Sequence, residues 1–354
     1  MKKYVPLVGG CIVDFPTELE KIEDVPVRRW VEHHLPPAGG LNVVPVLPKK
    51  VQDYFEGSAE GMLTGGGPGN VGRRLAGLAV PVRIHGYVGN DKWGNFYRQT
   101  MEGYGVDVSR IKVDPRQSTS VTVVVNFRAG NELERSFIHV LGSNLNDQSQ
   151  LYQPDRYEAE IGYYGYLYIT GNWPKSASDM GNVLQRMKES GKTAVLATTA
   201  DPRRSWDGAE PALRNADIFL ANDLEARGIS RKTDTRKMAQ YFHDLGVPIV
   251  SITNGANGCA ISRGDEFYQK PAHNAPEKDV LAAGDSYAAG LMYALLGQLE
   301  IPDDFGKVDI DFMLDYGNAM GALAVVGYPR ITAAMAEKVL SAPEGTWPDL
   351  SGLV

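Results

Sequence analysis

Short apolar segments alternate with amphipathic segments through the second half of the chain. The apolar segments have the length and composition of buried strands, and the segments between them have the spacing of surface helices. Strands are expected at residues 165–171, 193–199, 216–222 and 247–254, and helices at 176–190 and 235–246. This order predicts right-handed crossovers and a mostly parallel sheet covered on both faces, with ligands bound beyond the carboxyl ends of its strands.

The first half of the chain follows a different pattern. A first buried strand, GGCIVDF, is expected to end at Asp14. The segment from there to about residue 64 is rich in proline, which obstructs helix interiors and central strands, so we predict neither there. Residues 118–128 and 134–141 alternate as a β-hairpin around Ala129-Gly130-Asn131. These parts are therefore expected to form a small flap beside the main sheet.

Composition narrows the class of protein. The 354 residues carry 36 Lys and Arg against 43 Asp and Glu, a net charge of -7, which argues against a general nucleic-acid binder. No apolar run is long enough to span a membrane, and Pro6 with Gly9-Gly10 interrupts the apolar start, unlike a signal peptide. Cys11 and Cys259 lie far apart without metal-site spacing. We expect a cytoplasmic protein with two buried thiols and no membrane or nucleic-acid partner.

The stretch DVLAAGDSYAAGLMYALLG, residues 279–297, has Asp285 where an apolar helix is expected to begin. Two interpretations fit this position. Aspartate is a favoured N-cap, because its side chain accepts hydrogen bonds from amides that have no partner inside the helix. Alternatively, those amides bind a phosphate group and the carboxylate is a catalytic base beside it.

Other polar or flexible residues also fall at expected strand ends or helix starts. They are Asp14, Gly65, Gly66, Asn70, Asn222, Glu225 and the segment TNGANG at 253–258. Each has a structural interpretation as a turn, a loop or a helix cap. Each also has a functional one, since glycines allow close approach of a ligand and the oxygens of Asn222 and Glu225 are of the type that Mg²⁺ prefers.

In their order along the chain, these motifs resemble those of the ribokinase-like carbohydrate kinases, the PfkB family. GGCIVDF is similar to the family's first strand, which ends in a substrate-binding acid. GGGPGNVGRRLAGL, followed by GYVGNDKWGNFYRQTMEGYGVDVSRI, resembles its amino-terminal signature. ELERSFIHVLGSN resembles the lid strand, NDLE the Asn-x-x-Glu magnesium motif, TNGANG the nucleotide-side Gly-x-x-Gly, and DVLAAGDSYAAG the carboxyl-terminal signature.

The resemblance implies an α/β protein with a three-layer α/β/α ribokinase-like fold, a mostly parallel sheet and a small β lid. It implies a single domain over residues 1–354, with the lid at about 15–64 and 116–145. The implied activity is transfer of the γ-phosphate of ATP, with Mg²⁺, to a hydroxymethyl group of a small sugar or sugar acid, with Asp285 as general base. The other residues carried over are Ala282, Ala283 and Gly284 for the phosphate; Asp14, Gly65, Gly66, Asn70, Arg135 and Asn144 for the sugar; Asn222 and Glu225 for Mg²⁺; and Asn222, Thr253, Gly255, Gly258 and Asn318 for the nucleotide.

The chain departs from the family pattern in places. Val280 and Leu281 replace a usual threonine pair, and Ala282 replaces a glycine that helps the backbone wrap the transferred phosphate. Whether Ala282 slows the enzyme is open. Asp223 replaces a common glutamate inside Asn-x-x-Glu, and VVGYPRITAA lacks the usual Pro-Gly-Ala loop, which leaves a monovalent-cation site unsupported.

Two other functions stay open at this point. A nucleoside kinase of the same family differs from a sugar kinase in its lid and base pocket, which the sequence does not resolve. A non-catalytic sugar-binding protein on the same scaffold is disfavoured by retention of Asp285, Glu225 and Asn222. Exposed edge strands of the lid also predict a homodimer, because such edges pair readily with another chain.

Overall fold

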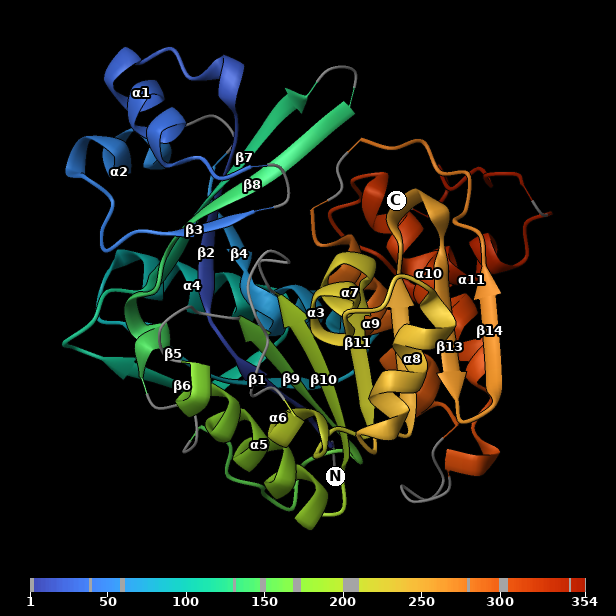
Figure 1. Cartoon of the computed structure of the whole chain (residues 1–354). Helices are drawn as coiled ribbons and strands as arrows, with labels where there is room; N and C mark the ends of the chain where they lie inside the picture. Colours follow the sequence, from blue (N-terminus) through green and yellow to red (C-terminus); the bar gives the residue numbers. More distant parts are fainter. Residues whose placement is uncertain are drawn as a thin grey trace.

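A nine-stranded sheet lies at the centre of the molecule (Figure 1). The computed structural model describes residues 3–37, 40–57, 61–129, 132–146, 151–167, 173–199, 210–278, 281–298, 305–343 and 345–353. The strand order is β14-β13-β12-β11-β10-β9-β1-β5-β6. The strands are β1 (Val5–Gly9), β5 (Val82–Gly89), β6 (Asp107–Asp114), β9 (Ile161–Leu167), β10 (Thr193–Thr199), β11 (Ile218–Asn222), β12 (Ile249–Thr253), β13 (Cys259–Arg263) and β14 (Glu266–Lys270). Neighbours from β6 to β12 pair parallel, and β13 and β14 pair antiparallel.

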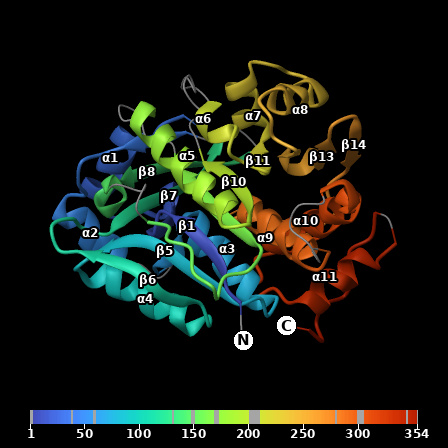
Figure 2. The ribbon, with the colours of Figure 1, turned by 90° about the horizontal axis from the view of Figure 1, so that it is seen from below.

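Helices cover both faces of this sheet (Figure 2). Consecutive strand residues point to opposite faces, so Leu7 and Ile218 join one apolar cluster while Val8 and Phe219 join another. Four helices cover the first cluster: α3 (Gly66–Gly77), α9 (Ala283–Leu296), α10 (Ile310–Val325) and α11 (Ala333–Leu340). Four others cover the second cluster: α5 (Trp173–Glu189), α6 (Glu210–Leu213), α7 (Asp223–Ser230) and α8 (Thr235–Asp244). Burial on both faces explains why the strands are continuous apolar runs.

A second, five-stranded sheet extends from the carboxyl edge of the first, in the order β3-β8-β7-β2-β4. Its strands are β2 (Ile12–Glu18), β3 (Leu41–Val43), β4 (Leu63–Gly65), β7 (Ser120–Ala129) and β8 (Glu132–Val140). One face carries Phe15, which stacks on Phe55 with ring centroids 6.1 Å apart. The other face carries Asp14, Thr122 and His139, which are direct neighbours across the strands. The predicted mostly parallel sheet with a small β lid is therefore confirmed.

The proline-rich segment contains helices, which corrects our expectation that it is irregular. Helices α1 (Val25–His34) and α2 (Lys49–Glu56) cover the outer face of the small sheet, and α4 (Lys92–Gly103) packs beside it. Pro26 lies in the first turn of α1, after the N-cap Asp24, and Pro48 is the N-cap of α2. Proline is tolerated there because the first helical amides have no intrahelical acceptor. Pro26 and Pro48 thus mark where α1 and α2 begin, whereas Pro16 lies inside β2, which runs past Asp14 to Glu18 between β7 and β4.

Several local predictions agree with the structure. The strand at 193–199 has the predicted bounds, and β7 and β8 form the predicted hairpin. Cys11 and Cys259 are free and buried. Within the described residues, no helix combines the length and the apolar character needed to cross a bilayer. The division of residues 1–354 into one domain with a discontinuous lid stays a prediction.

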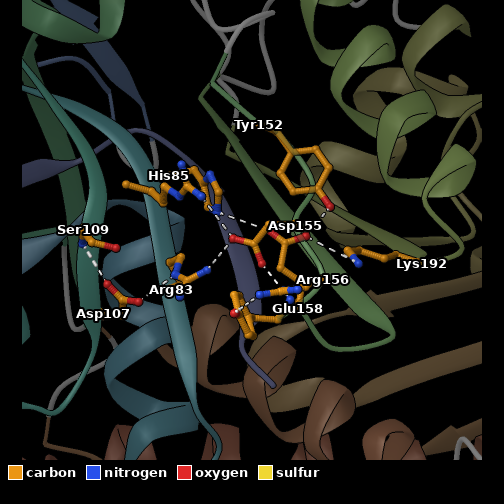
Figure 3. A network of polar contacts seen from close by, with 11 residues as sticks. Arg83, His85, Asp107, Ser109, Tyr152, Asp155, Arg156, Glu158 and Lys192 are labelled. Atoms are coloured by element: carbon orange, nitrogen blue, oxygen red, sulfur yellow. Dashed lines mark hydrogen bonds and ion pairs between the residues drawn. The ribbon is translucent and has the colours of Figure 1, made fainter. Parts of the chain in front are cut away.

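A buried polar network lies at the amino-terminal edge of the large sheet, opposite the lid (Figure 3). Glu158, 5% exposed, accepts a hydrogen bond of 2.8 Å from the Tyr152 hydroxyl, and its carboxylate is 3.4 Å from Nζ of Lys192. His85 Nε2 is 3.6 Å from the same carboxylate. Burial raises the pKa of Glu158 and lowers the pKa of His85 to about 4. Lys192 is therefore the cation that compensates a buried carboxylate.

We expect Lys192→Met to lower the free energy of unfolding at pH 7.5 by about 3–5 kcal/mol, because it leaves the Glu158 carboxylate buried and uncompensated. A carboxyl group whose folded pKa is raised costs stability as the pH rises through that pKa, so the loss should shrink at pH 5. Urea unfolding at both pH values measures this. The control is Lys188→Met, since the side chain of Lys188 is 40% exposed in its pair with Asp217; an equal loss there would contradict the role of burial.

Candidate active site

Asp285 lies inside the first turn of α9, which begins at Ala283 with Ala282 as the N-cap. The N-cap interpretation of Asp285 is therefore wrong. Its Oδ2 accepts a hydrogen bond of 2.8 Å from Nδ2 of Asn70, which lies in the first turn and a half of α3. Two helices that begin at the same edge of the sheet thus hold the carboxylate between them.

The first backbone amides of α9 have no hydrogen-bond acceptor among the described residues. The first hydrogen bond of the helix runs from the amide of Ser286 to the carbonyl of Ala282. Among the described residues, the amides of Ala283, Gly284 and Asp285 have no acceptor. A Cβ atom added at Gly284 would meet nothing within 4 Å. Unpaired amides at a helix start bind anions, since they carry the positive end of the helix dipole.

A cavity of about 190 Å³ separates this helix from the small sheet. Six of the residues predicted from the sequence line it: Asp14, Gly66, Asn70, Arg135, Ala282 and Asp285. Thr122, Phe137 and His139 of the small sheet also line it, and the sequence-based prediction missed them. Their signal was present, because alternation along the hairpin puts every second residue on the face that carries Asp14.

The two aspartates that line the cavity, Asp14 and Asp285, have pKa values above the ordinary value for aspartate. Burial raises the pKa of Asp285 to about 6, against the opposing effects of the Asn70 hydrogen bond and the charges of Arg73 and Arg74. Burial also raises the pKa of Asp14 to about 7; the charge of Arg73 lowers it and the charge of Asp285 adds to the rise. A carboxylate with a pKa near neutrality is suited to accept a proton from an alcohol and release it later.

Glycine is required where the backbone turns beneath Asp14. A Cβ at Gly65 would lie 1.9 Å from Oδ2 of Asp14, and Gly66 has a φ of +73° with the carbonyl oxygen of Gly10 only 2.2 Å from an added Cβ. Asn144, 7% exposed, does not line the cavity; it lies behind Gly10, where a Cβ would approach its Nδ2 to 2.7 Å. Asn144 therefore supports the turn that forms the floor of the cavity.

Asn222 and Glu225 form a capping box at the start of α7. Oδ1 of Asn222 accepts from the amide of Glu225 at 2.8 Å, and Oε2 of Glu225 accepts from the amide of Asn222 at 2.9 Å. The structural interpretation of this pair is thus correct. The described residues contain no group of three His, Cys, Asp or Glu side chains able to hold a metal. Two oxygen donors fit Mg²⁺, which keeps most of its waters and is completed by substrate phosphates.

The remaining predicted residues lie further along the same sheet edge and outside the cavity. Thr253 ends β12 beside Asn222, and a short 3₁₀ turn, Gly255–Asn257, leads into β13. Gly258 has a φ of +94° and lies against the carbonyl oxygen of Lys270, so no side chain fits. Nδ2 of Asn318 in α10 donates to the carbonyl of Pro271 at 2.8 Å. None of these residues lines the cavity.

Comparison with known proteins identifies the family. The profile of the pfkB family carbohydrate kinases matches residues 46–330. The chain belongs to this family. As a pfkB carbohydrate kinase it is an ATP-binding phosphotransferase with an alcohol group as acceptor.

Curated relatives of this pfkB kinase act on different substrates. It is 27% identical over 302 residues to aminoimidazole riboside kinase from Salmonella typhimurium, covering 82% of this chain and 88% of the relative. It is 27% identical to fructokinase from Klebsiella pneumoniae, covering 76% and 88%. It is 24% identical to ribokinase from Haemophilus influenzae, covering 74% and 80%. Similarity at this level leaves the substrate unresolved.

Solved structures share the fold of this pfkB kinase. Fructokinase from Vibrio cholerae O395, solved with fructose, ADP and calcium ion, superimposes with a TM-score of 0.68 at 19% identity, over 96% of this chain and 99% of the other. A putative ribokinase II from E. coli, solved with ATP and Mg²⁺, gives 0.67 at 18%, over 95% and 98%. Adenosine kinase from Sinorhizobium meliloti gives 0.72 at 18%, over 95% and 98%. These likenesses establish the fold alone.

We expect Asp285 to titrate near pH 6 in the free enzyme. Carbon-13 NMR of aspartate-labelled protein measures this, with Asp285→Asn to assign the signal. Asn70→Ala should raise the pKa further, because it removes a hydrogen bond that stabilises the ionised form. Titration of Asp285 at its ordinary value, below pH 4.5, would contradict the buried environment described here.

Proposed function

We propose that this kinase transfers the γ-phosphoryl group of ATP to a hydroxymethyl group of a small sugar or sugar acid, with Asp285 as general base. The observation that carries this proposal is the position of the Asp285 carboxylate. It is held by Asn70 at the wall of the cavity, in the same helical turn as three amides that have no acceptor among the described residues. Phosphoryl transfer to an alcohol requires a base for the hydroxyl proton and a site for the negatively charged phosphoryl group. The first turn of α9 offers both.

In the reaction, Asp285 takes the proton from the hydroxyl group as its oxygen attacks the γ-phosphorus in line with the departing ADP. The amides of Ala283, Gly284 and Asp285 accept the charge on the equatorial oxygens of the phosphoryl group. One preorganised donor of this kind is worth about 3 kcal/mol in the transition state. The protein otherwise contributes orientation, because the two substrates are held at fixed positions.

The sugar is bound by the floor and wall of the cavity. Asp14 accepts hydrogen bonds from two hydroxyl groups, and Asn70 both donates and accepts. The glycines at 65 and 66 let the sugar approach the backbone closely. Arg135 binds from the lid, while Asn144 acts through the turn at Gly10. Closure of the lid excludes water, which would otherwise compete for the phosphoryl group.

The nucleotide binds along the sheet edge beside the cavity. Thr253, Gly255, Gly258 and Asn318 line its path, and Asn222 and Glu225 hold Mg²⁺ through water. When bound, the metal neutralises charge on the phosphates. Gly258 keeps the β12–β13 turn free of side chains, so the nucleotide can lie against the backbone there.

A second candidate acceptor is a riboside. Leu41 and Phe137 are direct neighbours across β3 and β8, and both line the cavity about 7 Å beyond the row that contains His139. An apolar wall at this place favours a substrate whose sugar carries a planar substituent. The non-catalytic sugar-binding protein is the remaining alternative.

A panel of acceptors tests these functions together. We expect ADP release with one of fructose, ribose, 2-keto-3-deoxygluconate, aminoimidazole riboside or adenosine, in the presence of Mg²⁺. Asp285→Asn should lower kcat by a factor of about 10²–10⁴, because a general base contributes that much. Asparagine keeps the oxygen that Asn70 contacts, so the variant should fold. Near-normal turnover of this variant would remove the base assignment, and sugar-induced thermal stabilisation without any turnover would favour the binding protein.

The homodimer through the lid stays a prediction. The edge strands β3 and β4 have three residues each, and α1 and α2 already cover one face of the small sheet. A dimer would therefore form from the edges rather than from a face. Light scattering should give a mass of about twice 38.6 kDa. A mass of one chain across the accessible concentration range would contradict the prediction.

A further inference from the structure

Ala282 has a backbone conformation that alanine rarely adopts. It is the residue directly before α9, with φ 58° and ψ 20° in the left-handed region. Residues with a Cβ atom disfavour this region, which glycine enters freely. The direction of the amides that follow Ala282 depends on this conformation, because φ and ψ of Ala282 set the course of the backbone into α9. Some interaction must therefore stabilise it.

Ser286 binds the carbonyl group of Ala282 twice. Its backbone amide donates to that oxygen at 2.9 Å, and its side-chain hydroxyl donates to the same oxygen at 2.8 Å. The side chain of Ser286 is completely buried. Because the hydroxyl group has one proton, its orientation toward Ala282 leaves its lone pairs free to accept.

Arg74 supplies the donor for that hydroxyl. Its Nε donates to Oγ of Ser286 at 3.0 Å, and its Nη1 donates to the carbonyl of Tyr328 at 3.0 Å. Arg74 is 5% exposed, and its guanidinium group is held between the buried Ser286 and the backbone carbonyl of Tyr328. A chain of hydrogen bonds thus runs from Arg74 through Ser286 to the carbonyl of Ala282.

The same face of α3 contacts Asp285 as well. Asn70 and Arg74 are four residues apart, which puts them one helical turn from each other on one side of the helix. Asn70 binds the carboxylate of Asp285, and Arg74 binds the residue after it. Helix α3 therefore fixes both the base and the backbone that surrounds it.

We propose that Arg74 is a positioning residue that acts through Ser286 to hold Ala282 in the left-handed conformation, and so keeps the amides of residues 283–285 aimed at the transferred phosphoryl group. The proposal rests on the function proposed above. The proposal also gives a reason for the burial of an arginine beside the site, because moving its charge out of water costs stability.

A mutant cycle tests the link between Arg74 and Ala282. Arg74→Met should lower kcat at least tenfold with less than a threefold change in KM for the acceptor, and Ser286→Ala should do the same to a smaller extent. Ala282→Gly removes the conformational preference that the arginine opposes. On the glycine background, the loss caused by Arg74→Met should shrink at least threefold. Equal losses on both backgrounds would overturn the proposal.

A matched control separates positioning from general stability. Arg83 is also a buried arginine, 9% exposed, and lies in the network of Figure 3 at the opposite edge of the sheet. Arg83→Met should lower Tm but leave kcat unchanged. If Arg83→Met lowers kcat as much as Arg74→Met at matched Tm, the effect of Arg74 is structural and the proposal fails. Ser286→Ala keeps the test valid should Arg74→Met not fold.

A binding measurement makes the outcome independent of the acceptor. In calorimetry with Mg²⁺, Arg74→Met should weaken AMP-PNP at least fivefold more than ADP, because the third phosphate reaches the amides of α9. An equal effect on both nucleotides would contradict the proposal. Failure of the general-base assignment would appear differently, as normal turnover of Asp285→Asn with this nucleotide preference intact.

Discussion

The hydrogen bond between Asn70 and Asp285 joins residues 215 positions apart in the chain. It exists because α3 and α9 both begin at the carboxyl edge of the large sheet and lie against the same face of it. Neither helix could position the carboxylate alone, since the first turn of a helix is its least constrained part. The position of the Asp285 carboxylate in this pfkB kinase therefore depends on how two distant helices pack on one sheet.

The charged side chains near the contact between Asn70 and Asp285 shift the pKa values of two acids in the cavity. Two acids, Asp14 and Asp285, share one cavity, and burial raises the pKa of both. The charge of Arg73, on the next turn of α3, opposes the rise at both acids, and the charge of Arg74 opposes it at Asp285. Asp285, with a pKa of about 6, is therefore largely ionised at neutral pH and still basic enough to take part in proton transfer, whereas Asp14, with a pKa of about 7, is ionised only in part.

The small sheet serves two purposes because its residues alternate. Phe15 and its neighbours are buried under α1 and α2, while Asp14 and Thr122 face the cavity. A shift by one residue in the register of β2 would exchange the two faces and remove the site.

The sequence by itself determined the alternation of strands and helices, the β-hairpin, the candidate acids and the family resemblance, since these follow from local periodicity and from motifs of adjacent residues. It misjudged the prolines at 26 and 48, because their effect depends on whether they fall at a helix start or inside it. Tertiary structure alone decided that Asp285 contacts Asn70 instead of capping α9 and that Arg74 reaches Ser286. Those outcomes depend on contacts between segments hundreds of residues apart, which no local pattern in the chain records.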